Sequence, residues 1–176
     1  LLFVLVLHVF ADLQKGRDAF DKGDTAAALK EFKPLAEQGD LDSQFHLARM
    51  YDDGEGIPED KAEAVKWYQL AAEQGDFESQ FFLGEMYATG KGVPKDDVLA
   101  YMWFNIASFQ GNETAGPWTS DTAKTMKDVM ALTMTSAEIA QALSKQSLKR
   151  NDDCKNYKLP LTTVLKETWN IILSLF

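Results

Sequence analysis

Five carboxylates lie within nine residues, a density that would suit a calcium site. They are Asp52, Asp53, Glu55, Glu59 and Asp60. Carboxylate oxygens are the ligands that Ca²⁺ prefers, which makes this stretch the first candidate for chemistry. Its carboxylates do not, however, follow the ligand spacing of an EF-hand loop.

This acidic stretch has a copy that keeps its glycines and its proline and loses most of its charge. Tyr51–Asp60 returns 36 residues later as Tyr87–Asp96, and over positions 88–96 the only carboxylate is Asp96. The loop can therefore form without a metal ion, since the residues that set its backbone are retained without the ligands. We predict no metal site.

Histidine and cysteine provide little support for catalysis. Beyond the apolar N-terminal run the chain has one histidine, His46, and no serine or cysteine sits in a recognisable nucleophile motif. We predict that the protein is not an enzyme and uses no cofactor. Cys154 is the only cysteine, so an intramolecular disulfide is excluded, and a buried thiol or a disulfide-linked dimer remain as alternatives.

An internal repeat organises these residues. When 41–76 is aligned with 77–112, fifteen positions are identical, and each copy has the pattern helix, glycine-rich loop, helix. Trp67 and Trp103 fall on the apolar stripe of the second helices. We therefore predict that they belong to the core, not to a stacking platform for a ligand.

The flanking segments complete the organisation. Residues 12–40 match half of the repeat and have a shorter turn, and 113–150 are expected to form a C-terminal helical capping hairpin that includes a capping box at Thr135 and Glu138. Residues 151–176 form an amphipathic tail of uncertain packing. It either folds back on the repeats or is exposed to a partner or a membrane surface.

Residues 1–11 are uncharged and apolar, and they end in Val9-Phe10-Ala11. This pattern is typical of the end of a secretory signal peptide, so we expect cleavage after Ala11, an initiator methionine upstream, and a periplasmic or secreted protein. The alternative is an apolar first helix buried under the repeats. The run is shorter than the roughly 20 residues of a membrane span.

The formal charge of −9 argues against partners that are themselves strongly negative. Nucleic acids and anionic membranes attract basic surfaces, so we predict neither of them as the general partner. The shortness of the apolar run 1–11 separately predicts no transmembrane span.

The repeat carries a resemblance to a known family. The pattern Ser-Gln-x-x-Leu-x-x-Met-Tyr-x-x-Gly-x-Gly, followed by Pro-x-Asp and later by Ala-x-x-Trp and Gln-Gly, resembles the Sel1-like repeat, a relative of the tetratricopeptide repeat. The resemblance implies an all-α fold, an α-solenoid of antiparallel helix pairs in a right-handed superhelix with a C-terminal helical cap. It also implies a scaffold or adaptor that assembles other proteins, and an exported bacterial type.

Positions at which the two copies differ on a stable scaffold are the candidates for binding. Asp42, His46 and Arg49 correspond to Glu78, Phe82 and Glu85, and each set has the i, i+4, i+7 spacing of one helix face. In the family's superhelix the first helices line the concave side, so this stripe would face the groove. A mixed acidic and aromatic groove suits a basic or amphipathic peptide. Tolerated surface variation is the alternative.

Two functions are consistent with these observations. The first is a non-catalytic scaffold of the cell envelope that binds a protein or peptide in the concave groove. The alternative is a cell-envelope enzyme or small-molecule-binding protein related to β-lactams. Cysteine-rich Sel1-like proteins suggest that alternative, but their regular cysteine pairs are absent from this chain.

Overall fold

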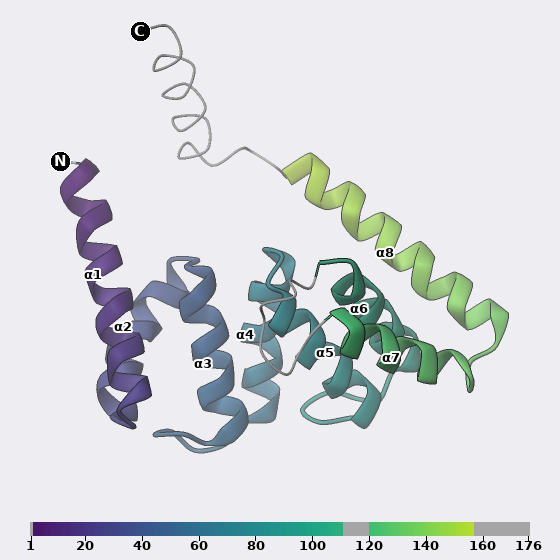
Figure 1. The fold of residues 1–176 in the computed structure, drawn as a ribbon, viewed down its shortest axis with the longest axis horizontal. Coiled ribbons are helices and arrows are strands. Elements are labelled where there is room, and N and C mark those ends of the chain that lie inside the picture. Colours follow the sequence, from purple (N-terminus) through teal and green to yellow (C-terminus); the bar gives the residue numbers. More distant parts are fainter. Residues whose placement is uncertain (1, 111–119, 157–176) are drawn as a thin grey trace, which may run out of the picture. The chain divides into compact units, whose positions relative to one another are not determined.

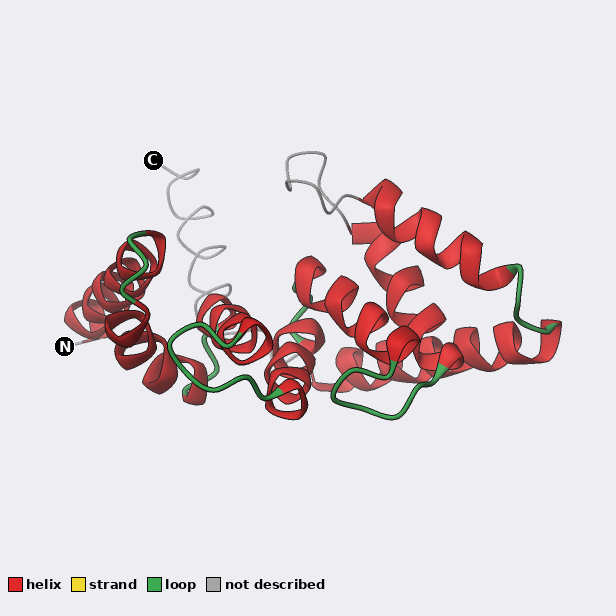
Figure 2. Cartoon of the chain, turned by 90° about the horizontal axis from the view of Figure 1, so that it is seen from below, coloured by secondary structure: helices red, strands yellow, loops and turns green. Residues whose placement is uncertain are grey.

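The computed structural model describes the backbone of residues 2–110 and 120–156 and the side chains of 11–109 and 120–149. Within those ranges all regular secondary structure is helical, and short loops join the helices (Figures 1 and 2). The helices are α1 (Leu2–Asp21), α2 (Thr25–Glu37), α3 (Leu41–Asp53), α4 (Lys61–Glu73), α5 (Phe77–Thr89), α6 (Asp97–Gln110), α7 (Ser120–Ala131) and α8 (Ser136–Asn156).

Each helix from α1 to α6 packs against the helix that follows it in the chain. Connections of a few residues between packed helices make neighbours antiparallel. The predicted fold, an all-α solenoid of helix pairs, is therefore confirmed. The described chain forms two compact units that divide within α8, after Ala142.

The loops inside the two repeats have the same backbone, for a reason that also explains their glycines. Gly56 and Gly92 have φ of 78° and 73°, and a side chain at either position would collide with Thr25 at the start of α2 or Lys61 at the start of α4. Each loop thus docks on the second helix of the preceding unit. The loop glycines that the two copies share all have positive φ: Gly54, Gly56, Gly90 and Gly92.

A buried glutamine joins each repeat to the unit before it. Gln44 donates from Nε2 to the carbonyl of Ala36, 3.1 Å away, and Gln80 donates in the same way to Ala72 over 3.2 Å. Both acceptors lie in the last turn of a helix, where carbonyls have no partner inside the helix. The Ser-Gln pair shared by the two repeats therefore has a structural role.

The aromatic residues of the second helices belong to the core, as predicted. Trp103 is 3% exposed, and Trp67 packs against the same cluster. In the first helices the small residues Ala48 and Gly84 are buried, and an added methyl on Gly84 would lie 2.7 Å from the ring of Phe104. The small side chain thus allows α5 and α6 to approach closely.

Polar side chains cap the first turns of several helices. Asp40 and Asp60 accept the backbone N–H groups of Ser43 and Glu63 at 2.8 and 3.0 Å. At the start of α8 the Glu138 carboxylate accepts from the Thr135 N–H at 2.7 Å, which confirms the capping box.

The two ends of the chain are described in part. The backbone of α1 continues from Leu2 through Ala11 without a break, and the side chains of residues 1–10 are outside the described ones, so cleavage after Ala11 stays a prediction. The helix that follows the predicted capping box, α8, extends from Ser136 to Asn156. Residues 111–119 and 157–176, with most of the amphipathic tail predicted for 151–176, fall outside the described residues. Among the described helices, none has the length and apolar character needed to cross a membrane.

Candidate functional site

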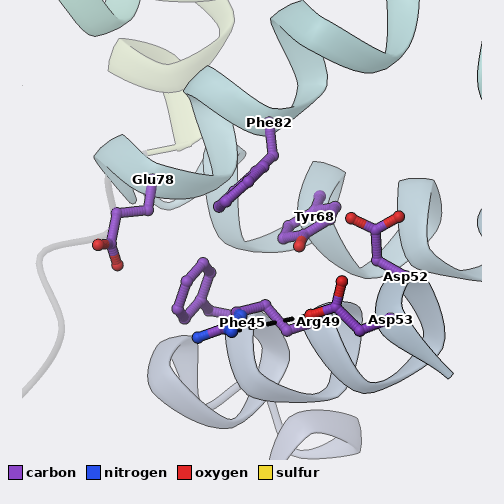
Figure 3. A pocket seen from close by; sticks show the side chains of 7 residues that line it. All are labelled: Phe45, Arg49, Asp52, Asp53, Tyr68, Glu78 and Phe82. Carbon is purple, nitrogen blue, oxygen red and sulfur yellow. Dashed lines mark ion pairs between the residues drawn. The ribbon is translucent and has the colours of Figure 1, made fainter. Parts of the chain in front are cut away.

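A half-open pocket of about 370 Å³ lies between α3, α4 and α5 (Figure 3). Aromatic rings form its centre, and charged side chains flank them on two sides. The lining residues are Phe45, Arg49, Asp52, Asp53, Tyr68, Glu78 and Phe82.

Three rings make the apolar wall of the pocket. Tyr68 and Phe82 stack with centroids 5.2 Å apart at an interplanar angle of 20°. The ring centroid of Phe45 lies 6.2 Å from that of Tyr68 and 6.3 Å from that of Phe82. Burial is the main cause that raises the pKa of the Tyr68 hydroxyl, and the nearby Asp52 carboxylate adds to it. The wall is therefore uncharged at every physiological pH.

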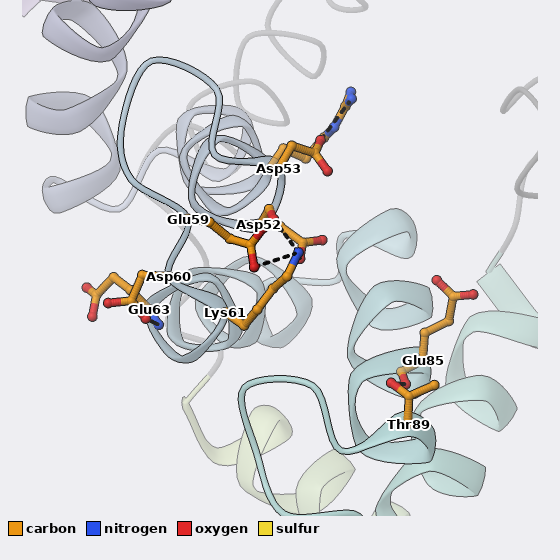
Figure 4. A network of polar contacts seen from close by, with 9 residues as sticks. Asp52, Asp53, Glu59, Asp60, Lys61, Glu63, Glu85 and Thr89 are labelled. Carbon is orange, nitrogen blue, oxygen red and sulfur yellow. Dashed lines mark hydrogen bonds and ion pairs between the residues drawn. The ribbon is translucent and has the colours of Figure 1, made fainter.

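The acidic residues from α3 have cations of their own. Asp53 pairs with Arg49 over 3.7 Å. Asp52 pairs with Lys61 over 2.8 Å, and Lys61 also donates to the Asp52 carbonyl and lies 3.8 Å from Glu59 (Figure 4). These two carboxylates thus add little net charge to the pocket.

Glu78 is different because it has no such partner. No Lys or Arg nitrogen of the described residues lies within ion-pair distance of Glu78, which stands at the opposite end of the pocket from Asp52 and Asp53 (Figure 3). Burial, reinforced by Asp76, raises the pKa of Glu78. Burial likewise raises the pKa of Glu85, two turns further along α5. Arg49 partly opposes the rise for Glu78 but lies beyond ion-pair distance of it, and a half-buried carboxylate without an ion pair favours a cation from outside the chain.

Two of the other predicted site residues face α1 instead of the pocket. Asp42 pairs with Arg17 over 2.6 Å. The ring of His46 stacks on Phe32, with centroids 4.7 Å apart at 3°, and lies 5.2 Å from Phe20. Burial is the main cause that lowers the pKa of His46, and the positive charge of Arg17 adds to it, so the ring is neutral near pH 7. These contacts join α3 to α1 and α2.

The pocket therefore unites half of the predicted stripe. Arg49, Glu78 and Phe82 line it, whereas Asp42, His46 and Glu85 do not. The remaining lining residues were not among those selected from the sequence: Phe45, Asp52, Asp53 and Tyr68.

The acidic loop is organised by hydrogen bonds and by lysine. Asp60 caps α4, while Asp52 and Glu59 form ion pairs with the Lys61 ammonium (Figure 4). In the part of the chain that the structure describes, no three His, Cys, Asp or Glu side chains are grouped so that they could hold a metal ion.

Comparisons with known proteins identify the architecture. The family model of the Sel1 repeat matches residues 41–76 and 77–112. A crystal structure of a Sel1 repeat protein from Oxalobacter formigenes is 31% identical, with a TM-score of 0.59, and the match covers 69% of this chain and 88% of that protein. The chain belongs to the Sel1 repeat family.

A second similar structure of this family is larger. The crystal structure of c5321, a protective antigen of uropathogenic Escherichia coli strains with an SLR fold, is 26% identical with a TM-score of 0.70. The match covers 86% of this chain, which spans about a third (33%) of the length of c5321. No curated protein matches the sequence. Sel1 repeats are commonly scaffolds for protein interactions and are typically non-catalytic.

Comparison of the two Sel1 repeats could find only part of the pocket. Phe45 corresponds to Phe81, so a search for differences between the copies passes over it. Asp52 and Asp53 do differ from their copies, but their place in the acidic loop directed attention to metal binding. Arg17, which lies in α1 outside the aligned repeats, gave no repeat-based signal.

Proposed function

We propose that this Sel1 repeat protein is a non-catalytic scaffold that binds a segment of another protein on the face formed by α3 and α5. The pocket carries the proposal. It combines an aromatic wall with one half-buried carboxylate, Glu78, for which the described residues provide no ion pair. Tyr68 is buried and Phe45 and Phe82 are half-buried, so a complementary segment would cover the accessible edges of these two rings beside a carboxylate that has no ion pair among the described residues.

A small molecule is the second candidate, because about 370 Å³ is enough volume for a small ligand. The pocket is open on one side and has four charged side chains among its seven lining residues. Sites for small molecules are more often enclosed and mostly apolar. These features favour a protein segment.

A site-directed cross-link tests the scaffold function. A photoreactive amino acid at Glu85, beside the pocket on α5, is compared with the same residue at Leu70, an exposed position of α4. After irradiation in cells, a partner that cross-links only through position 85 is identified by mass spectrometry and purified. We expect the purified partner to bind the wild type and to lose at least about tenfold in affinity with Phe82→Ala.

Two results would contradict this function. One is the same set of cross-linked proteins at both positions. The other is a partner whose affinity is unchanged by Phe82→Ala, provided that urea unfolding shows the variant to be folded.

We also propose a periplasmic or secreted location, supported by the apolar run 1–11. Mass spectrometry of the protein isolated from cells, expressed with its natural upstream sequence, should show a mature chain that begins at Asp12. A chain that retains residues 1–11 would count against export by cleavage.

A further inference from the structure

We propose that the pocket between α3 and α5 binds one arginine side chain of the partner segment. The guanidinium would pair with Glu78 and lie against the rings of Phe45 and Phe82. This inference rests on the proposed scaffold function and adds the chemistry of the group that is recognised.

The charges of the pocket leave room for one cation. Asp53 is balanced by Arg49 and Asp52 by Lys61, at 3.7 and 2.8 Å. Glu78 is the lining carboxylate for which the described residues provide no ion pair, and it is half-buried. Its desolvation is already present in the free protein, so a cation that arrives there gains attraction without the full cost of burying the carboxylate.

The rings favour a planar cation. The centroids of Phe45 and Phe82 are 6.3 Å apart, and the ring planes are tilted by 31°. A cation within about 6 Å of an aromatic face is attracted by the ring quadrupole. A guanidinium also stacks on such faces and forms two parallel bonds to a carboxylate, whereas an ammonium is a strongly hydrated point charge.

The same protein already holds an arginine in this manner. The Arg49 guanidinium lies 5.6 Å from the centre of the Phe20 ring and pairs with Asp53. Arg49 also attracts Glu78 and partly opposes the rise of its pKa, but the Arg49 nitrogens lie beyond ion-pair distance of that carboxylate. One ring and one carboxylate are therefore sufficient to position a guanidinium on this scaffold.

The test uses short random peptides displayed on phage and selected against the full chain. We expect the recovered sequences to share an arginine. The strongest binder is then synthesised in three forms, with arginine, with lysine, and with citrulline, which has nearly the same shape and no charge. The citrulline form should bind about tenfold more weakly or worse, with the lysine form between the two.

Protein variants locate the contact. In Glu78→Gln the arginine and citrulline peptides should bind with nearly equal affinity, because the variant removes the carboxylate that distinguishes them. Glu37→Gln, at an exposed carboxylate of α2, should keep the full difference. Phe82→Leu accompanies Phe82→Ala as the milder change, and each should weaken the arginine peptide, the alanine variant more.

The outcomes separate the two proposals. If peptides lose affinity with the Phe82 variants but contain no shared cation, or if citrulline binds as well as arginine, the arginine site is wrong and the scaffold face stands. If Glu78→Gln and Glu37→Gln reduce the affinity for the arginine peptide equally, general charge attraction explains the binding and the arginine site is wrong. If no peptide is recovered, or if the Phe82 variants bind every peptide normally, both proposals fail.

Discussion

The two repeat tryptophans provide the sharpest test of the packing. Truncating a buried tryptophan to alanine costs about 3–5 kcal/mol. Trp103, 3% exposed, should show this full cost in Trp103→Ala. Trp67 is partly exposed, and its indole N–H is buried without a hydrogen-bond acceptor among the described residues.

The unsatisfied indole reduces the expected loss at Trp67. Leaving a buried donor unpaired costs about 1–3 kcal/mol, and truncation removes that cost together with the packing. Subtraction from the lower part of the packing range leaves about 2 kcal/mol for Trp67→Ala. Trp67→Phe, which removes the donor and retains a ring, should cost about 1 kcal/mol or less.

Urea unfolding measures all three variants, followed by both circular dichroism and fluorescence. Coincident transitions with an unchanged slope would allow the free energies of unfolding to be compared. The reasoning would be refuted by a larger loss for Trp67→Ala than for Trp103→Ala. A Trp67 variant as stable as the wild type that no longer binds a selected peptide would also refute it, because it would place Trp67 in a binding site.

Three further variants test other parts of the structure. Gly84→Ala should lower the free energy of unfolding by about 1 kcal/mol, measured in urea, because the added methyl would overlap the Phe104 ring. This overlap outweighs the better helix propensity of alanine. A stabilised variant would show that the Phe104 ring moves aside. Gln44→Leu leaves a buried carbonyl of α2 without its donor and should cost about 1–3 kcal/mol, whereas Gln38→Leu, on the surface, should cost little. Burial raises the pKa of Glu78 in the folded chain, so the free energy of unfolding falls as pH rises from the ordinary glutamate pKa through the raised one. Glu78→Gln should therefore be more stable than the wild type at pH 7, and this difference should shrink below the ordinary glutamate pKa. If the two proteins have the same urea unfolding curves at both pH values, this prediction is wrong.

The glutamate variant joins stability to function. If Glu78→Gln unfolds at higher urea and also loses its preference for the arginine peptide, the carboxylate is retained at a cost in stability for the sake of binding. Such a trade-off is typical of functional residues and differs from the behaviour of a packing residue. The two measurements use the same purified protein.

The local structure was predictable because it depends on residues close together in the chain. Glycines with positive φ, aspartate caps and the capping box of α8 are set by short-range sterics and hydrogen bonds. The 36-residue repeat, in turn, determines that the same helix pair recurs and packs on itself. These signals were sufficient for an all-α solenoid and for the tryptophans as core residues.

The pocket was only partly predictable because identical residue types have different surroundings in the two repeats. Phe45 lines the pocket below α5, whereas its copy Phe81 is 1% exposed and belongs to a cluster that contains Ala123 of α7. His46 and Phe82, by contrast, share a repeat position, and so do their stacking partners Phe32 and Tyr68, so this contact recurs in both units. A comparison of the two copies treats Phe45 and Phe81 as equivalent and does not show that Phe81 packs with α7.

The sequence by itself thus determined the repeat, its loops and caps, and the fold class, since each follows from backbone chemistry within one repeat or from its recurrence. Tertiary structure alone decided which side chains meet. Stacking one helix pair on the next brings Phe45, Tyr68 and Glu78 from three helices to one pocket, although they are 33 residues apart at most. It also pairs Asp52 and Asp53 with cations and, among the described residues, gives Glu78 no ion pair, because ion pairs depend on distances in space that no spacing along the chain contains.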